Sequence, residues 1–260
     1  MSDNVLVRVD DPSGTITLNR PHRRNALSRE LIESLINAFE DLHQEKRVRA
    51  VILTGAGADF SAGTDLHQLH ETAGADNSFE RWYDDVLQLQ RLIETMLRYP
   101  KPIIAAVNGW AIGSGLALMM AADIVVVGHH SRWQLPEARR GLSAGITTPL
   151  LCFRVGSGLA ACVLFSGKPI AAAAALNYGL VHEIVDDDLI WARSFELAQA
   201  CAAGARESHQ MAKRMLNETI GEHLFTQLSI GAANMATART TDAAREGIAA
   251  FLEKREPKWL

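Results

Sequence analysis

Residues 101–123, KPIIAAVNGWAIGSGLALMMAAD, decide the fold of this chain. The run Ile103–Val107 is short and continuously apolar, which predicts a strand that is buried on both faces. Closely spaced glycines then break the run, and the small and apolar residues over 115–122 predict a buried helix. A second apolar run, Ile124–Val127, predicts the next strand. A strand, a glycine loop, a helix and another strand in this order indicate an α/β domain.

The segment from Ile103 to Ala122 also has the length and the apolar composition of a bilayer-spanning helix. Asn108 and Ser114 interrupt it, glycines fall close together, and Asp123 follows at once. Breaks of this kind are expected between the elements of a soluble domain and not within a span. The segment therefore predicts no membrane helix.

The flanking sequence extends the α/β pattern in both directions. The strands expected from apolar runs next to turn signals are Val5–Val9, Thr15–Leu18 and Ala50–Thr54, the first two as a hairpin. Helices are expected after the cap residue Ser28, from Asp65 and over Arg81–Arg98, with residues 70–80 as a mobile loop. The later pattern is almost entirely helical, with starts near Gly145, Ser157, Ala171, Asp188, Glu207, Glu222 and Asp242.

The composition suits one large domain or one domain with an appendage. The chain has 260 residues, of which 48% are hydrophobic, so it can bury a substantial core. A boundary near Ala203 and Gly204 divides it into a core over 1–203 and a helical region over 204–260. The net charge of −4, without a long run of like charge, argues against nucleic acid and anionic membranes as partners.

The cysteines and the first residues bear on the compartment. Cys152, Cys162 and Cys201 lie far apart and form no CxxC pair. This spacing favours buried thiols in a reducing compartment over a disulfide framework or a zinc site. The first residues hold aspartates and no long apolar segment, so they resemble neither a signal peptide nor a transit peptide. We therefore expect a cytoplasmic protein.

Other patterns point to chemistry only weakly. Gly55-Ala56-Gly57 follows a strand, but Phe60 stands where a dinucleotide-binding loop has its third glycine. His67 and His70 share a helix face, yet no third ligand lies near them in the sequence. Solvated histidines are therefore favoured over a metal site, and we expect no metal. No Gly-x-Ser-x-Gly elbow of a serine hydrolase occurs.

Two glycine-containing turns are candidates for a site. Residues 60–66, FSAGTDL, and residues 110–115, WAIGSG, each lead into a helix. Such a turn presents free backbone N–H groups with the positive end of the helix dipole behind them. Two of them facing each other can hold a carbonyl oxygen as it becomes an oxyanion, at about 3 kcal/mol for each well-placed donor. On glycine content alone, ordinary tight turns are the simpler interpretation.

Motifs along nearly the whole chain favour a functional site over ordinary tight turns. They are ITLNRP at 16–21, NAL at 25–27, SAGTDL at 61–66, KPIIAAVNG at 101–109, LPE at 135–137, FSGK at 165–168, YGLV at 178–181 and FLEKR at 251–255. Taken in this order they resemble the enoyl-CoA hydratase/isomerase, or crotonase, family. The resemblance implies a crotonase-like spiral of strand–strand–helix repeats. It also implies C-terminal helices that build trimers, often paired into hexamers.

The resemblance further implies an acyl-CoA substrate and no separate cofactor, because coenzyme A is part of the substrate. It assigns the backbone N–H groups of Thr64 and Ser114 to an oxyanion hole, where Ser114 replaces a glycine and narrows the pocket. The implied contacts to coenzyme A and substrate are Arg24, Ala26, Ala62, Asp65, Leu66, Phe251 and Lys254, the last two on one helix face of a neighbouring subunit. Arg23 and Arg24 meet phosphate or form a solvated basic turn, and the sequence favours neither.

Glu137, in the segment SRWQLPEARRG at 131–141, is the predicted acid and base. A carboxylate in an apolar pocket has a raised pKa, so it can take and return a proton near neutral pH. The alternative is a surface glutamate that pairs with Arg139 or Arg140.

Many hydratases of this family carry a second glutamate where this chain has Ala117. Without it, a water that adds across a double bond loses one of its two positioning carboxylates. A single-glutamate enoyl-CoA isomerase is therefore slightly favoured over a single-glutamate hydratase. Thioester hydrolysis, C–C cleavage and a non-catalytic CoA-binding subunit remain as alternatives. The run LSAGITTP at 142–149 also departs from a glycine-rich family segment, which predicts a reshaped acyl pocket.

Overall fold

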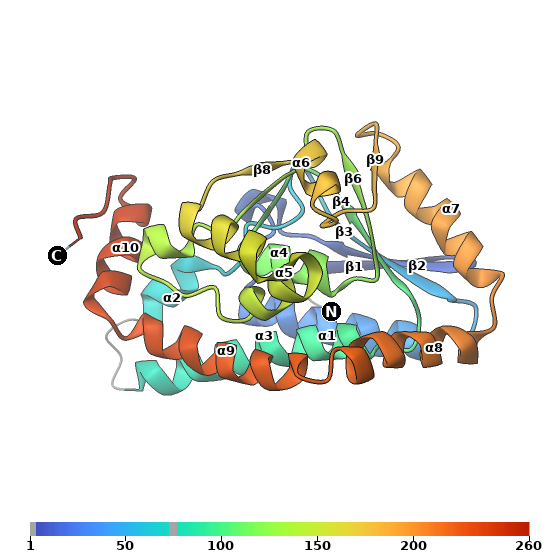
Figure 1. Cartoon of the computed structure of the whole chain (residues 1–260), viewed down its shortest axis with the longest axis horizontal. Coiled ribbons are helices and arrows are strands. Elements are labelled where there is room, and N and C mark those ends of the chain that lie inside the picture. Colours follow the sequence, from blue (N-terminus) through green and yellow to red (C-terminus); the bar gives the residue numbers. More distant parts are fainter. Residues whose placement is uncertain (1–3, 73–76, 260) are drawn as a thin grey trace.

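Two β-sheets and the helices around them make up the described chain (Figure 1). The computed structural model describes residues 4–72 and 77–259. The strands are β1 (Val5–Asp10), β2 (Ser13–Leu18), β3 (Ala50–Gly55), β4 (Ile103–Val107), β5 (Trp110–Ile112), β6 (Ile124–Gly128), β7 (Arg132–Gln134), β8 (Ile170–Ala171) and β9 (Glu183–Val185). The helices are α1 (Arg29–Gln44), α2 (Leu66–Thr72), α3 (Ser78–Arg98), α4 (Ser114–Ala121), α5 (Thr147–Ser166), α6 (Ala172–Asn177), α7 (Ile190–Ala202), α8 (Arg206–Arg214), α9 (Leu224–Arg239) and α10 (Asp242–Leu252), with short helical turns η1 (Pro21–Arg23), η2 (Glu137–Arg140) and η3 (Met215–Ile220).

The larger sheet has the order β1-β2-β3-β4-β6-β9, and every pair except β1 with β2 is parallel. The antiparallel pairing of β1 with β2 confirms the predicted hairpin. All residues of β4 are buried, as expected for a central parallel strand. The apolar segment Ile103–Ala122 is thus divided among β4, β5 and α4, which confirms the predicted strand and helix, while the predicted loop between them contains the short strand β5.

Alternate residues of the central strands pack into two different cores. Val51 and Leu53 belong to the larger apolar cluster, together with the buried faces of α1 and α3. Ile52 and Ile104 point the other way and pack with Ile190 of α7. Helices on both faces therefore bury the central strands β3, β4 and β6, which explains why these strands are nearly continuous apolar runs.

The smaller sheet, with the order β5-β7-β8, makes the fold a spiral. β4 is followed by β5 and α4, and β6 is followed by β7 and α5, so each turn contributes one strand to each sheet. Ser61, just after β3, extends the pattern through a bridge to Ala111 in β5. The predicted strand–strand–helix repeats are thereby confirmed.

Helices form the C-terminal region, as expected. Figure 1 shows α8 and α9 along one side of the molecule, next to α1 and α3, and α3 packs against α9. The predicted starts near Gly145 and Ser157 correspond to α5, which is kinked where Gly156 has non-helical angles of φ 77° and ψ 161°. Among the described residues, α5 alone is long and apolar enough to cross a membrane by length and composition, which is weak evidence by itself. In the fold it packs against α4 and α9.

Some expectations about local structure differ from the fold. The strands β5, β7, β8 and β9 are missed because two or three residues are too few to show a period. The loop expected over 70–80 is wrong at both ends, since 70–72 belong to α2 and 78–80 to α3, while 73–76 lie outside the described residues. Trp82 Nε1 donates to Thr72 Oγ1 at 2.9 Å and so joins the two helices. The boundary between 203 and 204 falls between α7 and α8, and as a domain boundary it stays a prediction.

Gly231 tests how closely α9 packs against the segment that leads into α5. A Cβ at Gly231 would lie 2.1 Å from Gly145 O. Gly231→Ala therefore forces two backbones apart and should lower the free energy of unfolding by about 1–3 kcal/mol in denaturant titrations. Gly158→Ala is the matched control, because nothing lies within 4 Å of its Cβ and Ala favours helix by about 1 kcal/mol. Unchanged stability of Gly231→Ala would contradict this packing.

Candidate active site

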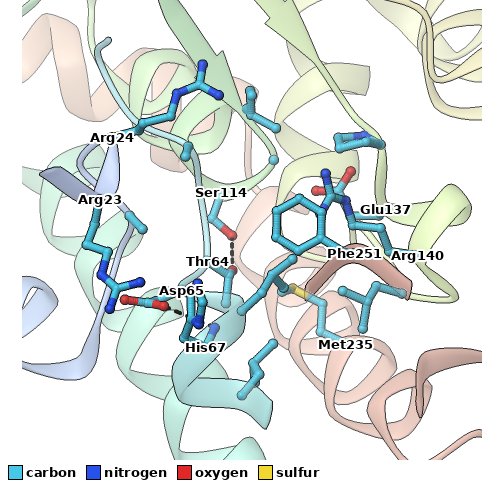
Figure 2. Close-up of a pocket in the computed structure, with 18 of the residues that line it drawn as sticks. Arg23, Arg24, Thr64, Asp65, His67, Ser114, Glu137, Arg140, Met235 and Phe251 are labelled. Carbon is cyan, nitrogen blue, oxygen red and sulfur yellow. Dashed lines mark hydrogen bonds between the residues drawn. The ribbon is translucent and has the colours of Figure 1, made fainter. Parts of the chain in front are cut away.

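A cavity of about 340 Å³ gathers residues that are far apart in the sequence (Figure 2). Its walls come from the loop before α1, the two glycine turns, η2, and the ends of α9 and α10. Of the predicted site residues, the cavity brings together Arg24, Ala26, Ala62, Thr64, Asp65, Leu66, Ser114, Glu137 and Phe251. Lys254 is not among the residues that line it.

Backbone hydrogen bonds hold the two glycine turns side by side. Ser61 N donates to Trp110 O at 3.0 Å, and Ile112 N donates to Ser61 O at 2.9 Å. Gly113 N donates to Gln134 O at 3.0 Å, which ties the second turn to β7. The two turns that the sequence singles out are therefore neighbours in space.

Thr64 and Ser114 meet where these turns adjoin, and Figure 2 shows their side chains pointing toward each other. Their hydroxyl oxygens lie 2.9 Å apart and share a hydrogen bond. Ser114 is the first residue of α4, so its N–H lies at the positive end of that helix. Within residues 4–72 and 77–259, neither backbone N–H has a hydrogen-bond acceptor. Two free donors in one cavity wall can bind a single oxygen atom.

Glu137 begins η2, and its carboxyl group is held away from water. Oε2 has no hydrogen-bond partner among the described residues. Burial raises the pKa of Glu137 to about 7, because the charged form is poorly solvated in the cavity. Its other oxygen packs over Gly113, where a Cβ would lie only 2.6 Å from Oε1. The group can therefore be protonated or ionised near neutral pH.

The arginines next to Glu137 have other contacts. Arg139 Nη2 donates to Ser166 O at 3.0 Å, outside the cavity. The guanidinium of Arg140 lies over the Phe251 ring, with Cζ 3.7 Å from the ring centroid. In the described part of the chain Glu137 thus has neither of the surface ion pairs that the sequence left open.

Ala117 lies on α4 and is fully buried, so no second carboxylate occupies that position. Asp65 is the other acidic residue in the cavity lining. Its carboxylate accepts a hydrogen bond from Arg20 at 3.0 Å and another from His67 N at 3.1 Å. Asp65 is therefore fixed at the start of α2, and Glu137 is the lining carboxyl group free to exchange a proton.

Asn25 holds the turn that carries Arg23 and Arg24 into the cavity wall. Arg24 and Asn25 both have left-handed backbones, with φ 51° and φ 54°, a conformation that costs free energy and is often found at functional sites. Asn25 Nδ2 donates to Ala56 O at 2.9 Å and to Asp59 O at 2.7 Å. Arg24 Nε donates to Asp59 Oδ2 at 2.6 Å, a hydrogen bond that raises the pKa of Arg24.

Phe251 lines the cavity of its own chain from the end of α10. The expectation that Phe251 and Lys254 share a helix face is wrong. α10 ends at Leu252, and Lys254 follows with φ 56°, which is not helical. A contact of either residue with coenzyme A in a neighbouring subunit stays a prediction.

Arg140, Met235 and Arg239 also line the cavity, although the sequence-based prediction did not place them in the site. Arg140 follows Glu137 by three residues, and that spacing in a tight helical turn places both on one side. The motif therefore contained a usable signal for Arg140. Met235 and Arg239 lie one turn apart on α9, and no local pattern connects them with residues 64 or 137. In the described chain no group of three or more Cys, His, Asp and Glu side chains is placed to hold a metal ion.

Comparison with known proteins identifies the family. A family model for enoyl-CoA hydratase/isomerase matches residues 13–260. A putative enoyl-CoA hydratase of Thermus thermophilus is 37% identical over 246 residues, which cover 94% of this chain and 96% of that protein. The 2,3-dehydroadipyl-CoA hydratase of Escherichia coli is 33% identical over 243 residues, which cover 93% of this chain and 92% of that protein.

The fold comparison agrees with this result. The crystal structure of an enoyl-CoA hydratase/isomerase from Xanthobacter autotrophicus Py2 is similar with a TM-score of 0.89 and 25% identity, covering 98% of both chains. The chain therefore belongs to the enoyl-CoA hydratase/isomerase family and has the crotonase fold, as its motifs predicted.

The raised pKa of Glu137 predicts a pH-dependent cost in stability. Between pH 4.5, the ordinary pKa of a glutamate, and a pH of about 7, Glu137 keeps its proton in the folded protein and releases it in the unfolded chain. Raising the pH through this range therefore destabilises the wild type, by about 3 kcal/mol at roughly 1.4 kcal/mol per pH unit. Glu137→Gln removes this loss, so its stability relative to wild type should rise from pH 4.5 to pH 7 and then level off. Urea unfolding at a series of pH values measures the difference, and a constant difference would contradict the burial of Glu137.

Proposed function

We propose that this protein is an acyl-CoA enzyme that moves a proton next to a thioester, with enoyl-CoA isomerisation as its reaction. One observation carries the proposal: the buried Glu137 carboxyl group, without a hydrogen-bond partner, shares a cavity with the free N–H groups of Thr64 and Ser114. Family membership supports an acyl-CoA substrate. The reaction needs no separate cofactor, because coenzyme A is part of the substrate.

The mechanism follows from these groups. The thioester oxygen binds between the N–H groups of Thr64 and Ser114, which stabilise the negative charge of the enolate. The Glu137 carboxylate takes a proton from the α-carbon of a 3-enoyl thioester and returns it to the γ-carbon. The double bond moves into conjugation and no atom is gained or lost. A pKa of about 7 suits a group that must act first as a base and then as an acid.

Hydration of a 2-enoyl thioester is the second candidate. It is supported by the names of the two relatives, a putative enoyl-CoA hydratase and a 2,3-dehydroadipyl-CoA hydratase. Ala117 speaks against it, because the attacking water would have one carboxylate to orient it and not two. Isomerisation needs only one carboxyl group, so we place it first.

We also propose a cytoplasmic homotrimer or a hexamer of two trimers. Several large apolar side chains of the C-terminal region are more than half exposed in the single chain, among them Met211, Met215, Leu216, Ile220 and Ile230. Apolar surface of this kind usually marks an interface between subunits. Its place on α8, η3 and α9 agrees with the helical region that the family resemblance assigns to oligomerisation.

Glu137→Gln tests the role of the carboxyl group. Turnover of trans-3-enoyl-CoA should fall about 10²- to 10⁴-fold, since general acid–base catalysis contributes a factor of this size. Ultraviolet absorbance of the conjugated thioester and product mass measure the reaction. Glu33→Gln, on the exposed face of α1, should retain full activity. Unimpaired turnover by Glu137→Gln would rule out the mechanism.

Product mass also separates the candidate reactions. An unchanged mass means isomerisation, and a gain of one water means hydration. Release of free coenzyme A would indicate hydrolysis, and a shortened acyl chain would indicate C–C cleavage. CoA binding without turnover on any enoyl-CoA would identify a non-catalytic subunit.

Ser114→Pro tests the oxyanion hole through its backbone. Proline is tolerated at the first position of a helix, where it removes the N–H without breaking a helical hydrogen bond. Turnover should fall about 10²- to 10³-fold, the usual effect of losing one oxyanion donor. Ser114→Ala keeps the N–H and should stay within about tenfold of wild type by the same reasoning. Equal losses in both variants would show that the hydroxyl group, and not the N–H, is what matters.

A further inference from the structure

Arg140 is a cation in the cavity whose hydrogen bonds are incomplete. Its Nη1 is shielded from solvent and has no hydrogen-bond partner among the described residues. Burial lowers the pKa of Arg140, against the opposing effect of Glu137. The Phe251 ring supports one face of the guanidinium at 3.7 Å, which fixes its plane and leaves its N–H edge for other contacts. A shielded N–H of an arginine without an acceptor is costly, so it indicates a missing partner.

Arg239 adds a second positive charge to the same cavity. It is 5% exposed, at the end of α9, and its Nη1 donates to Trp82 O at 3.0 Å. Asp85 lies 3.9 Å away, but both oxygens of Asp85 already accept hydrogen bonds from Arg29. The charge of Arg239 is therefore only partly compensated by protein groups.

The position of Arg140 separates it from the groups suited to coenzyme A. Figure 2 shows Arg23 and Arg24 on one side of the Thr64–Ser114 pair and Arg140, with Phe251 and Met235, on the other. On the proposed function, the thioester oxygen binds at Thr64 and Ser114. Coenzyme A and the acyl chain leave the thioester carbon in different directions, and Arg23 and Arg24 suit the phosphates of coenzyme A. Arg140 then lies along the acyl chain.

We propose that Arg140, assisted by Arg239, binds a carboxylate at the far end of the acyl group, so that the substrates are dicarboxylic acyl-CoA thioesters. This inference rests on the proposed acyl-CoA function and specifies its substrate class. A guanidinium presents paired N–H donors that match the two oxygens of a carboxylate. The ligand would supply acceptors to the N–H groups of the Arg140 guanidinium outside the shielded Nη1, since none of its N–H groups has a hydrogen-bond partner among the described residues, and it would supply the negative charge that the two arginines lack.

The acidic groups of the cavity do not compete for this role. Asp65 is bound by Arg20, and the Glu137 oxygens accept no hydrogen bond from Arg140. A purely electrostatic effect of Arg140 on Glu137 is the main rival explanation. That rival predicts an altered pH profile of turnover, with no preference between charged and neutral acyl ends.

Binding of unreactive thioesters tests the proposal without requiring turnover. Titration calorimetry would compare adipyl-CoA with hexanoyl-CoA, which has the same chain length and no terminal carboxylate. The wild type should bind adipyl-CoA at least about tenfold more tightly, a difference of about 1.4 kcal/mol. Arg140→Gln should reduce the ratio of the two affinities to about one, because it weakens the binding of adipyl-CoA and leaves the binding of hexanoyl-CoA unchanged. Arg139→Gln is the matched control, since it removes a neighbouring positive charge outside the cavity and should keep the ratio.

The outcomes separate this inference from the function on which it rests. Tight binding of both thioesters with equal affinity in the wild type would overturn the carboxylate site and leave the acyl-CoA function standing. Failure to bind either thioester would count against the acyl-CoA function itself. If Arg140→Gln does not fold, binding of the monomethyl ester of adipyl-CoA to the wild type tests the proposal. This ester has no terminal charge, so it should bind with the affinity of hexanoyl-CoA. An ester that binds as tightly as the free acid would overturn the proposal.

Discussion

The close approach of two glycine turns is the constraint on which the site depends. A Cβ on Gly63 would lie 2.4 Å from Ile112 O, and a Cβ on Gly115 would lie 2.7 Å from Ser61 O. Only glycine lets the backbones come close enough for the hydrogen bonds that join the turns. Those bonds place the Thr64 and Ser114 N–H groups in one wall, and the spiral of two sheets supplies the rigid support behind them.

Two polar side chains of the site lack the hydrogen bonds that buried polar groups usually have. Glu137 Oε2 and Arg140 Nη1 are both shielded from solvent without hydrogen-bond partners in the described chain. Each costs stability when the cavity is empty, because water and protein partners are both missing. The same burial gives Glu137 a pKa of about 7 and leaves Arg140 able to receive a negative group. The burial that costs stability at Glu137 and Arg140 is therefore also what suits them to the proton transfer and the anion binding that we propose.

Local pattern predicted the long elements well and the short ones poorly. β4 is identified by its continuous apolar run and α1 by apolar residues at helical spacing. Ser28 caps α1 as expected, accepting a hydrogen bond from Leu31 N at 3.3 Å. The strands of the smaller sheet have two or three residues and are specified by their neighbours, not by a period. The prediction that Phe251 and Lys254 share a helix face failed because the end of a helix depends on local backbone angles that residue spacing does not reveal.

The sequence by itself determined the family, the spiral of strand–strand–helix repeats, and the identity of Thr64, Ser114 and Glu137 as the residues to examine. The family and the three residues follow from contiguous motifs, and the spiral follows from the family that these motifs resemble. The tertiary structure decided which groups face one another, because those contacts join residues that are far apart in the chain. Only the fold places Arg140 against Phe251 and brings Arg239 into the same cavity. The cavity that buries Glu137 and raises its pKa is likewise assembled from separate parts of the chain, and no local pattern encodes it.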